Sequence, residues 1–317
     1  MLIFFASLFF TFSLTYLIRP FLKKYYLAIP NKRSSHVFPT PTGGGITIAI
    51  VSTIILISKG YYFLIGLIPI SYIGFIDDKK HVNSLVRFCI QLVTSYFLIY
   101  KNIDNLKWIL PDNIFLFFLI ILFLIIFSAT IINFINFMDG LDGLVSSCLI
   151  IAFSFISLFS INFYWVIVGS ILGFIYFNWQ PAKIFIGDVG TNFLSSMYLY
   201  ALFFSGTFDA FFSNIFILFP IFLDPFITLI RRLRLKQNIF LAHKMHLYQR
   251  LSQNGWSHSK VSLLFMCSCL ILSFFYLAFD LQGLFFGCLI FVIVYFKLDK
   301  WFAKPLVIED KITIMQN

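Results

Sequence analysis

The sequence contains few charged residues. Charged side chains make up only 11% of its 317 residues, whereas 60% are hydrophobic and 45 are Phe. A soluble domain of this length could not remove so much apolar surface from water. The composition therefore excludes a soluble protein and predicts an all-α integral membrane protein.

The sequence also lacks a signal peptide, a cysteine framework and a basic domain. Segment 1–18 has neither a basic start nor a small-residue cleavage site, which predicts a retained first span. All five cysteines fall in apolar runs and indicate neither disulfides nor a metal cluster. No basic stripe on a soluble region suggests nucleic acid as a partner. The sequence shows no repeat, no low-complexity tail and no segment long enough for a second domain, so residues 1–317 are expected to form a single membrane domain.

Eleven apolar runs predict about 11 transmembrane helices. They cover roughly residues 1–18, 43–58, 61–76, 84–100, 113–132, 143–160, 163–178, 190–206, 211–230, 261–279 and 282–297. The runs 43–58 and 61–76 are short and could form one hairpin, although Lys59-Gly60 favours a turn between two spans.

The distribution of Lys and Arg predicts the orientation. With the N-terminus outside and the C-terminus cytoplasmic, 20 of the 23 Lys and Arg lie on or near the cytoplasmic side. The net charge of +10 also suits anionic membrane lipids and phosphorylated substrates.

Six acidic residues lie within or at the edges of apolar runs. They are Asp77, Asp78, Asp139, Asp142, Asp188 and Asp224. Acidic groups near hydrocarbon are costly and by default mark a pathway or an active site. The predicted topology brings all six to the cytoplasmic face. An active site is therefore expected from the cytoplasmic segments 19–45, 77–91, 133–144, 178–190 and 224–250.

The most specific motif lies in segment 133–144. Asn133, Asn136, Asp139 and Asp142 recur every three residues, so that adjacent members face each other on a helix. Amide and carboxylate oxygens suit Mg²⁺ better than zinc. The motif Gly-Asp-Val-Gly at 187–190 is weak alone, but its place on the same face makes Asp188 a candidate to complete a metal site.

Asp77 and Asp78 are expected to have different roles. Neighbouring helical residues are separated by ~100° of rotation, so the two carboxylates cannot aim at one point while the helix continues. Three glycines at 43–45 enter a predicted helix, where backbone N–H groups can face an anion. A simple turn before a span explains these glycines equally well.

The cytoplasmic segment 224–250 is basic. It contains Arg231, Arg232, His243 and His246. These side chains can donate to phosphate or sugar hydroxyl groups. The two histidines could instead bind zinc, but no third ligand stands nearby.

Together these groups favour metal-assisted phosphoryl transfer at the membrane surface. A transporter or flippase of a lipid-linked sugar is an alternative, although its acids should lie near the membrane midplane. A phosphotransferase acting on CDP-activated headgroups is a third reading. Its acids would come from one compact motif, whereas here they come from separate loops.

Four motifs follow one another along the chain. They are Asp-Asp, Asn-x-x-Asn-x-x-Asp-Gly-x-Asp-Gly-Leu, Asn-x-x-Pro-Ala-x-x-Phe-x-Gly-Asp-x-Gly and His-x-x-His. In order and spacing the chain resembles the polyprenyl-phosphate N-acetylhexosamine-1-phosphate transferases of glycosyltransferase family 4, relatives of the phospho-N-acetylmuramoyl-pentapeptide transferases. The first loop, with Arg33-Ser-Ser-His36 and Pro39-Thr-Pro-Thr-Gly-Gly-Gly45, looks most like the O-antigen-initiating branch. Ala28 and Thr42 depart from the Asp and the basic residue expected there.

The resemblance implies transfer of a sugar 1-phosphate from a UDP-sugar to undecaprenyl phosphate at the cytoplasmic face of a bacterial inner membrane. UMP is released and Mg²⁺ is the cofactor, with Mn²⁺ as an alternative. A homodimer is compatible with the sequence.

The resemblance also implies roles for single residues. Asn136 and Asp188 would hold the metal, and Arg87 would contact the pyrophosphate. Asp77 or Asp78 would orient or deprotonate the lipid phosphate, and Asp139 would join them as a catalytic residue. The predicted substrate-binding residues are Phe185 on uracil, Asp142 and Asn178 on the nucleoside, Arg231, Arg232, His243 and His246 beside the sugar and phosphate, and Gly44.

Overall fold

The computed structural model describes residues 1–30, 34–159, 163–239, 241 and 243–305. The described chain is almost entirely helical, which confirms the predicted all-α membrane fold. Its helices are α1 (Leu2–Tyr25), α2 (Ile46–Ile57), η1 (Tyr62–Leu67), α3 (Ile68–Asp77), α4 (Ser84–Lys101), η2 (Ile103–Leu106), α5 (Ile114–Phe137), α6 (Leu144–Phe159), α7 (Tyr164–Asn178), α8 (Gly187–Phe204), α9 (Phe208–Ile217), α10 (Phe219–Arg234), α11 (Leu247–Gln253) and α12 (His258–Trp301). The short strands β1 (Leu27–Ala28) and β2 (Thr40–Pro41) pair antiparallel in the first loop.

The helices follow the predicted apolar runs with two notable features. By length and composition α1, α5 and α12 could each cross a membrane, and α9 with α10 would make a fourth span. The prediction of one regular span at 211–230 is wrong, because α9 and α10 meet at a 70° bend. Pro220 lies in the first turn of α10, where a proline is tolerated but cannot continue a preceding helix. Helix α12 contains non-helical residues at Phe279 and Asp280, between the two predicted spans.

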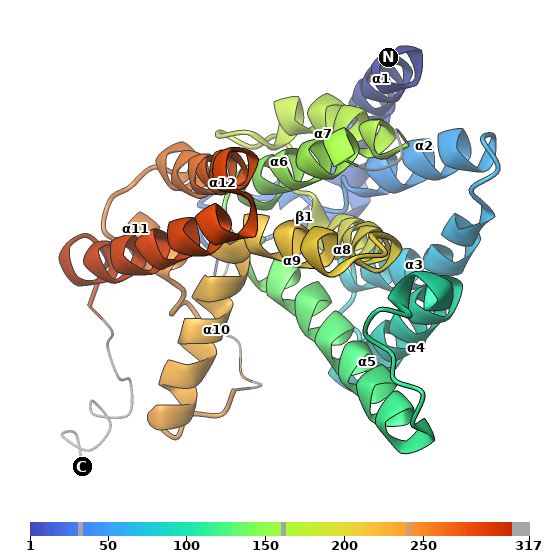
Figure 1. The fold of residues 1–317 in the computed structure, drawn as a ribbon. Coiled ribbons are helices and arrows are strands. Elements are labelled where there is room, and N and C mark those ends of the chain that lie inside the picture. Colours follow the sequence, from blue (N-terminus) through green and yellow to red (C-terminus); the bar gives the residue numbers. More distant parts are fainter. Residues whose placement is uncertain (31–33, 160–162, 240, 242, 306–317) are drawn as a thin grey trace.

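Helix α8 is the central helix of the bundle (Figure 1), and nearly all of its residues are buried. Glycines let α2 and α3 approach its first turn. A Cβ on Gly45 would lie 2.2 Å from the Cα of Gly190, and a Cβ on Gly74 would lie 2.6 Å from the carbonyl oxygen of Asp188. These contacts place the end of α3, with Asp77 and Asp78, beside the beginning of α8.

Candidate active site

A polar cavity of about 260 Å³ lies where the predicted segments meet. The first loop, the end of α3, the α5–α6 loop, the start of α8 and α11 all contribute to it. It is lined by Ser34, Ser35, His36, Thr42, Asp78, Asp139, Gly140, Leu141, Asp142, Asn178, Phe185, Gly187, Asp188, Gln249 and His258. The structure thus brings together carboxylates that are more than 100 positions apart in the sequence.

Asp78 caps the N-terminus of α8. Its Oδ1 accepts hydrogen bonds from the backbone N–H of Asp188 at 2.9 Å and from the hydroxyl of Thr42 at 3.1 Å, and its Oδ2 accepts from the N–H of Val189 at 3.2 Å. Gly187 permits this approach, because a Cβ there would lie 2.5 Å from both carboxylate oxygens. Burial raises the pKa of Asp78 to about 7, although these hydrogen bonds oppose the rise. Asp78 therefore holds Asp188 in place.

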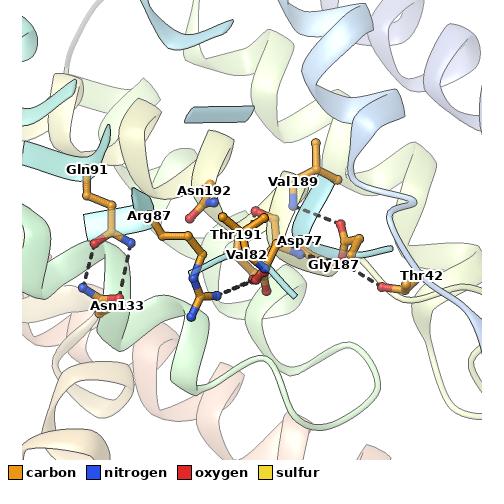
Figure 2. Close-up of polar contacts among 12 residues, drawn as sticks. Thr42, Asp77, Val82, Arg87, Gln91, Asn133, Gly187, Val189, Thr191 and Asn192 are labelled. Carbon is orange, nitrogen blue, oxygen red and sulfur yellow. Dashed lines mark hydrogen bonds and ion pairs between the residues drawn. The ribbon is translucent and has the colours of Figure 1, made fainter. Parts of the chain in front are cut away.

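Arg87 joins Asp77 to Asp188. Its Nη1 lies 2.5 Å from Asp77 Oδ2 and 3.1 Å from Asp188 Oδ2. The other oxygen of Asp77 accepts the backbone N–H of Val82 at 2.6 Å. Figure 2 shows Arg87 pointing toward Asp77 beside the first turn of α8. The two adjacent carboxylates thus have different partners, in agreement with the expectation that their roles differ.

A reciprocal amide pair fixes α4 against α5. The Nδ2 of Asn133 donates to Gln91 Oε1 at 2.9 Å, and the Nε2 of Gln91 donates to Asn133 Oδ1 at 3.3 Å (Figure 2). Arg87 precedes Gln91 by one helical turn, and Asn136 follows Asn133 by about one turn. The pair therefore sets the relative position of Arg87 and the predicted metal ligand Asn136, which is half-buried at the end of α5.

The side chain of Asp139 faces the cavity with no hydrogen bond or ion pair to any other described residue. Burial, together with the charges of Asp78 and Asp142, raises its pKa to about 8. A cation bound beside this group would favour its charged form and lower its pKa again.

The oxygen donors of the cavity fit Mg²⁺ as the implied metal. Within the described ranges, no group of three His, Cys, Asp or Glu residues forms a ready-made metal cage. Mg²⁺ does not need one, since it usually binds through one or two carboxylates, substrate phosphates and water. Asp188 and Asp139 present carboxylates to the same cavity, which satisfies this requirement.

The predicted nucleoside-reading residues line the cavity but also have protein partners. Asp142 lies 3.2 Å from His258 Nδ1 and accepts the N–H of Ala182 at 3.1 Å. Asn178 accepts from Ser146 and donates to the carbonyl of Ile184. His258 was not predicted from the sequence, because nothing beside it in the chain indicates a contact with Asp142.

Phe185 lines the cavity, whereas the N–H groups of Gly44 and Gly45 donate to backbone carbonyls of the protein. The N–H of Gly44 donates to the carbonyl of Phe185 at 2.9 Å, and that of Gly45 donates to the carbonyl of Ile186 at 2.8 Å. These bonds attach α2 to the segment before α8. The structure therefore uses the N–H of Gly44 in packing, and its contact with a substrate stays a prediction.

The four predicted residues of the basic segment lie outside the lining of the cavity. Arg231 forms two hydrogen bonds with Asp299, at 3.0 and 2.7 Å, and Arg232 donates to the backbone carbonyls of 238, 239 and 241. His246 Nδ1 lies 3.6 Å from Asp224. Burial lowers the pKa of His243 to about 3, so this ring is neutral at pH 7 and brings no positive charge. Direct contacts of these residues with a substrate stay predictions.

Asp224 organises this part of the protein. Its completely buried carboxylate accepts the N–H groups of Leu247 at 2.8 Å and Tyr248 at 3.0 Å, at the start of α11. The hydroxyl of Tyr248 in turn donates to the carbonyl of Phe137 at 2.8 Å. Asp224 therefore orients α11, which carries Gln249 to the cavity.

The chain is similar to known enzymes of one group. Residues 61–206, which include Asp77, Asp139 and Asp188, match the sequence model of glycosyl transferase family 4. A probable undecaprenyl-phosphate N-acetylglucosaminyl 1-phosphate transferase of Bacillus subtilis is 29% identical over 76% of this chain and 75% of its own. An undecaprenyl-phosphate alpha-N-acetylglucosaminyl 1-phosphate transferase of Thermotoga maritima is 29% identical over 86% of this chain and 87% of its own length. A phospho-N-acetylmuramoyl-pentapeptide-transferase of Fervidobacterium nodosum is 28% identical over 77% of this chain and 84% of its own length.

Proposed function

Since the chain is a relative of the polyprenyl-phosphate N-acetylhexosamine-1-phosphate transferases, we propose that it transfers an N-acetylhexosamine 1-phosphate from a UDP-sugar to undecaprenyl phosphate. An oxygen of the lipid phosphate attacks the β-phosphorus of the UDP-sugar, and the bond from this phosphorus to the bridging oxygen breaks. UMP leaves with that oxygen, and the product is a lipid-linked sugar diphosphate. It would begin the synthesis of an O-antigen or another cell-envelope polysaccharide.

The observation that carries this proposal is the convergence of Asp78, Asp139 and Asp188 on one cavity beside Arg87. When bound, Mg²⁺ would neutralise charge on the pyrophosphate. Asp188 and Asp139 are the residues best placed to hold it, with Asn136 as a further candidate. The proposal places this cavity at the cytoplasmic side of the inner membrane, in accordance with the distribution of Lys and Arg.

The roles of Arg87, Asp77 and Asp78 follow from their contacts. Arg87 is positioned by Asp77 and lies at hydrogen-bond distance from Asp188, from which it can reach the oxygens of a bound pyrophosphate. A phosphate monoester has a second pKa near ~6 and is mostly dianionic at neutral pH, so the acceptor needs no strong general base. We therefore assign Asp77 and Asp78 to positioning.

The alternative of a transporter rests on the bend between α9 and α10, because broken helices occur at the binding sites of transporters. Here the residues at the bend, Ile217, Leu218 and Phe219, are all apolar. The acidic groups that line the cavity come from helix ends and loops elsewhere. This distribution favours the transferase.

The proposal is tested with purified protein, Mg²⁺, undecaprenyl phosphate and UDP-N-acetylglucosamine carrying a label on the β-phosphate. We expect the label in the lipid fraction and UMP as the released nucleotide, both abolished in Asp188→Asn. Release of UDP would indicate transfer of the sugar alone and would contradict the proposal. A panel of UDP-sugars in the same assay identifies the preferred donor.

A further inference from the structure

An apolar groove of about 330 Å³ lies between α2 and α3, away from the active-site cavity. Both helices stand at one edge of the bundle (Figure 1), and residues of α8 form the base of the groove. Its described lining is apolar apart from Thr53, Ser71 and Tyr72. Ile54 and Tyr72, on its two sides, are each 64% exposed. In a membrane protein such an exposed apolar groove faces lipid and can hold a hydrocarbon chain.

Lysines and tyrosines gather at the end of the groove that is lined by Phe75. Lys79 follows Phe75 by about one helical turn, so both side chains lie on the same side of α3. The ring of Phe75 stacks on that of Tyr26 at a centroid distance of 4.5 Å. Lys79 Nζ lies 5.4 Å from the centre of the Tyr26 ring and 6.0 Å from that of Tyr25. Lys24 Nζ lies 5.1 Å from the centre of the Tyr25 ring, which therefore has two ammonium groups beside it.

The charges of Lys24 and Lys79 are not balanced by carboxylates of the described ranges. Both side chains are exposed, and neither forms an ion pair there. The acids that precede Lys79 are engaged elsewhere, Asp77 by Arg87 and Asp78 by the backbone of α8. Two ammonium groups beside one ring repel each other, and an anion between them removes this repulsion. This end of the groove is therefore suited to a negatively charged group.

The groove is closed off from the active-site cavity. The two share no described lining residue. Between them the backbones of α2 and α3 touch α8, where neither Gly45 against Gly190 nor Gly74 against Asp188 leaves room for a Cβ. A lipid whose chain lies in the groove cannot place its headgroup in the cavity while these contacts persist. Its headgroup instead reaches the lysines, whereas the acceptor lipid of the proposed reaction must bring its phosphate into the cavity.

We propose that the groove and the two lysines form a binding site for an anionic phospholipid of the membrane, distinct from the acceptor lipid. One acyl chain occupies the groove, and the phosphodiester lies between Lys24 and Lys79. Tyr25 and Tyr26 then stand at the level of the headgroups, where tyrosine is enriched in membrane proteins. The bound chain packs between α2 and α3 and stabilises the folded protein by binding to it.

The test measures binding of dioleoyl phosphatidylglycerol and dioleoyl phosphatidylcholine to purified full-length protein in detergent micelles, by native mass spectrometry. The wild type is expected to prefer phosphatidylglycerol, which should also raise its melting temperature. Lys24→Gln and Lys79→Gln should each weaken phosphatidylglycerol binding about fivefold, as the loss of one lysine beside an anionic lipid does. Their binding of phosphatidylcholine should stay unchanged.

Thr53→Phe tests the groove itself. The larger side chain fills part of the groove, and each methylene group that it keeps out should lower affinity about fourfold. Both phospholipids should therefore bind more weakly to this variant. Thr53→Leu, a smaller change, replaces it if thermal unfolding shows that Thr53→Phe is not folded.

Matched controls change the same residue types elsewhere. Lys297→Gln and Lys300→Gln remove exposed lysines near the end of α12, and Thr130→Phe enlarges a half-buried threonine of α5 that lines neither the cavity nor the groove. These variants are expected to bind both phospholipids like the wild type.

Equal affinity of the wild type for the two phospholipids would overturn the inference, as would unchanged binding in the lysine and Thr53 variants. Displacement of phosphatidylglycerol by undecaprenyl phosphate, with a raised KM for undecaprenyl phosphate in Thr53→Phe, would assign the groove to the acceptor and also overturn it. Phospholipid binding is measured without turnover, so the inference can hold even where the proposed reaction fails.

Discussion

Substitution of Gly187 by Ala tests the contact between Asp78 and α8. Gly187 has φ +72°, a region that a residue with a Cβ adopts at a cost of roughly 1–2 kcal/mol. The new Cβ would also lie 2.5 Å from both oxygens of Asp78, and such overpacking costs about 1–3 kcal/mol. We therefore expect the free energy of unfolding to fall by about 2–5 kcal/mol.

Gly60→Ala is the matched control for this substitution. Gly60 has φ +90°, but nothing lies within 4 Å of a Cβ at that position. Gly60→Ala is therefore expected to lower the free energy of unfolding only by the cost of the positive φ, about 1–2 kcal/mol, and to leave turnover unchanged. The difference between the two variants measures the crowding of Asp78 alone.

Thermal unfolding and turnover of UDP-N-acetylglucosamine are measured for both variants. Since Asp188 follows Gly187 directly, we expect turnover of Gly187→Ala to fall at least about 100-fold, as misplacing a catalytic group by ~1 Å can do. If Gly187→Ala matches Gly60→Ala in both stability and turnover, Asp78 does not hold α8 as described, and the reasoning is refuted.

Three further predictions concern the same region. At saturating Mg²⁺, Asp78→Asn should retain more turnover than Asp188→Asn, because Asp78 acts through positioning; an equal collapse would contradict this assignment. Gln91→Leu should lower the free energy of unfolding by about 1–3 kcal/mol, since it leaves Oδ1 of the half-buried Asn133 without its partner, while Nδ2 keeps the carbonyl of Ala129. The double variant with Asn133→Leu should recover part of this loss, which a double-mutant cycle measures. Because the folded-state pKa of His243, about 3, lies below the ordinary 6.5, stability should be lost as the pH falls below 6.5. The melting temperature of His243→Asn should therefore decline less than that of the wild type between about pH 6.5 and 5; parallel curves would exclude this linkage.

Much of the fold could be predicted from the sequence because membrane helices depend on local hydropathy. The apolar runs correspond to helices, including the interruption of α12 at Phe279–Asp280. The bend between α9 and α10 was missed, since residues 211–230 are apolar on both sides of Leu218. Hydropathy reports which residues avoid water and does not report the direction of the chain.

The candidate site could be predicted only in part. Asp139, Asp142 and Asp188 line one cavity, as their place at the ends of apolar runs suggested, and so do Asn178 and Phe185, which only the family resemblance indicated. Side chains recognised only by the structure complete it, namely His36, Gln249 and His258. His36 belongs to the first-loop motif, but neither that motif nor the sequence around Gln249 and His258 indicates that these side chains reach the cavity.

The sequence by itself determined that the protein is an all-α membrane protein with acidic residues at the ends of its apolar segments, because both properties follow from local composition. Only the tertiary structure decided which acids face the cavity and which serve as supports. Asp139 is left to face the cavity, whereas Asp78 and Asp224 cap α8 and α11. The role of a buried carboxylate depends on the N–H groups and cations that packing brings to it, and these come from distant parts of the chain.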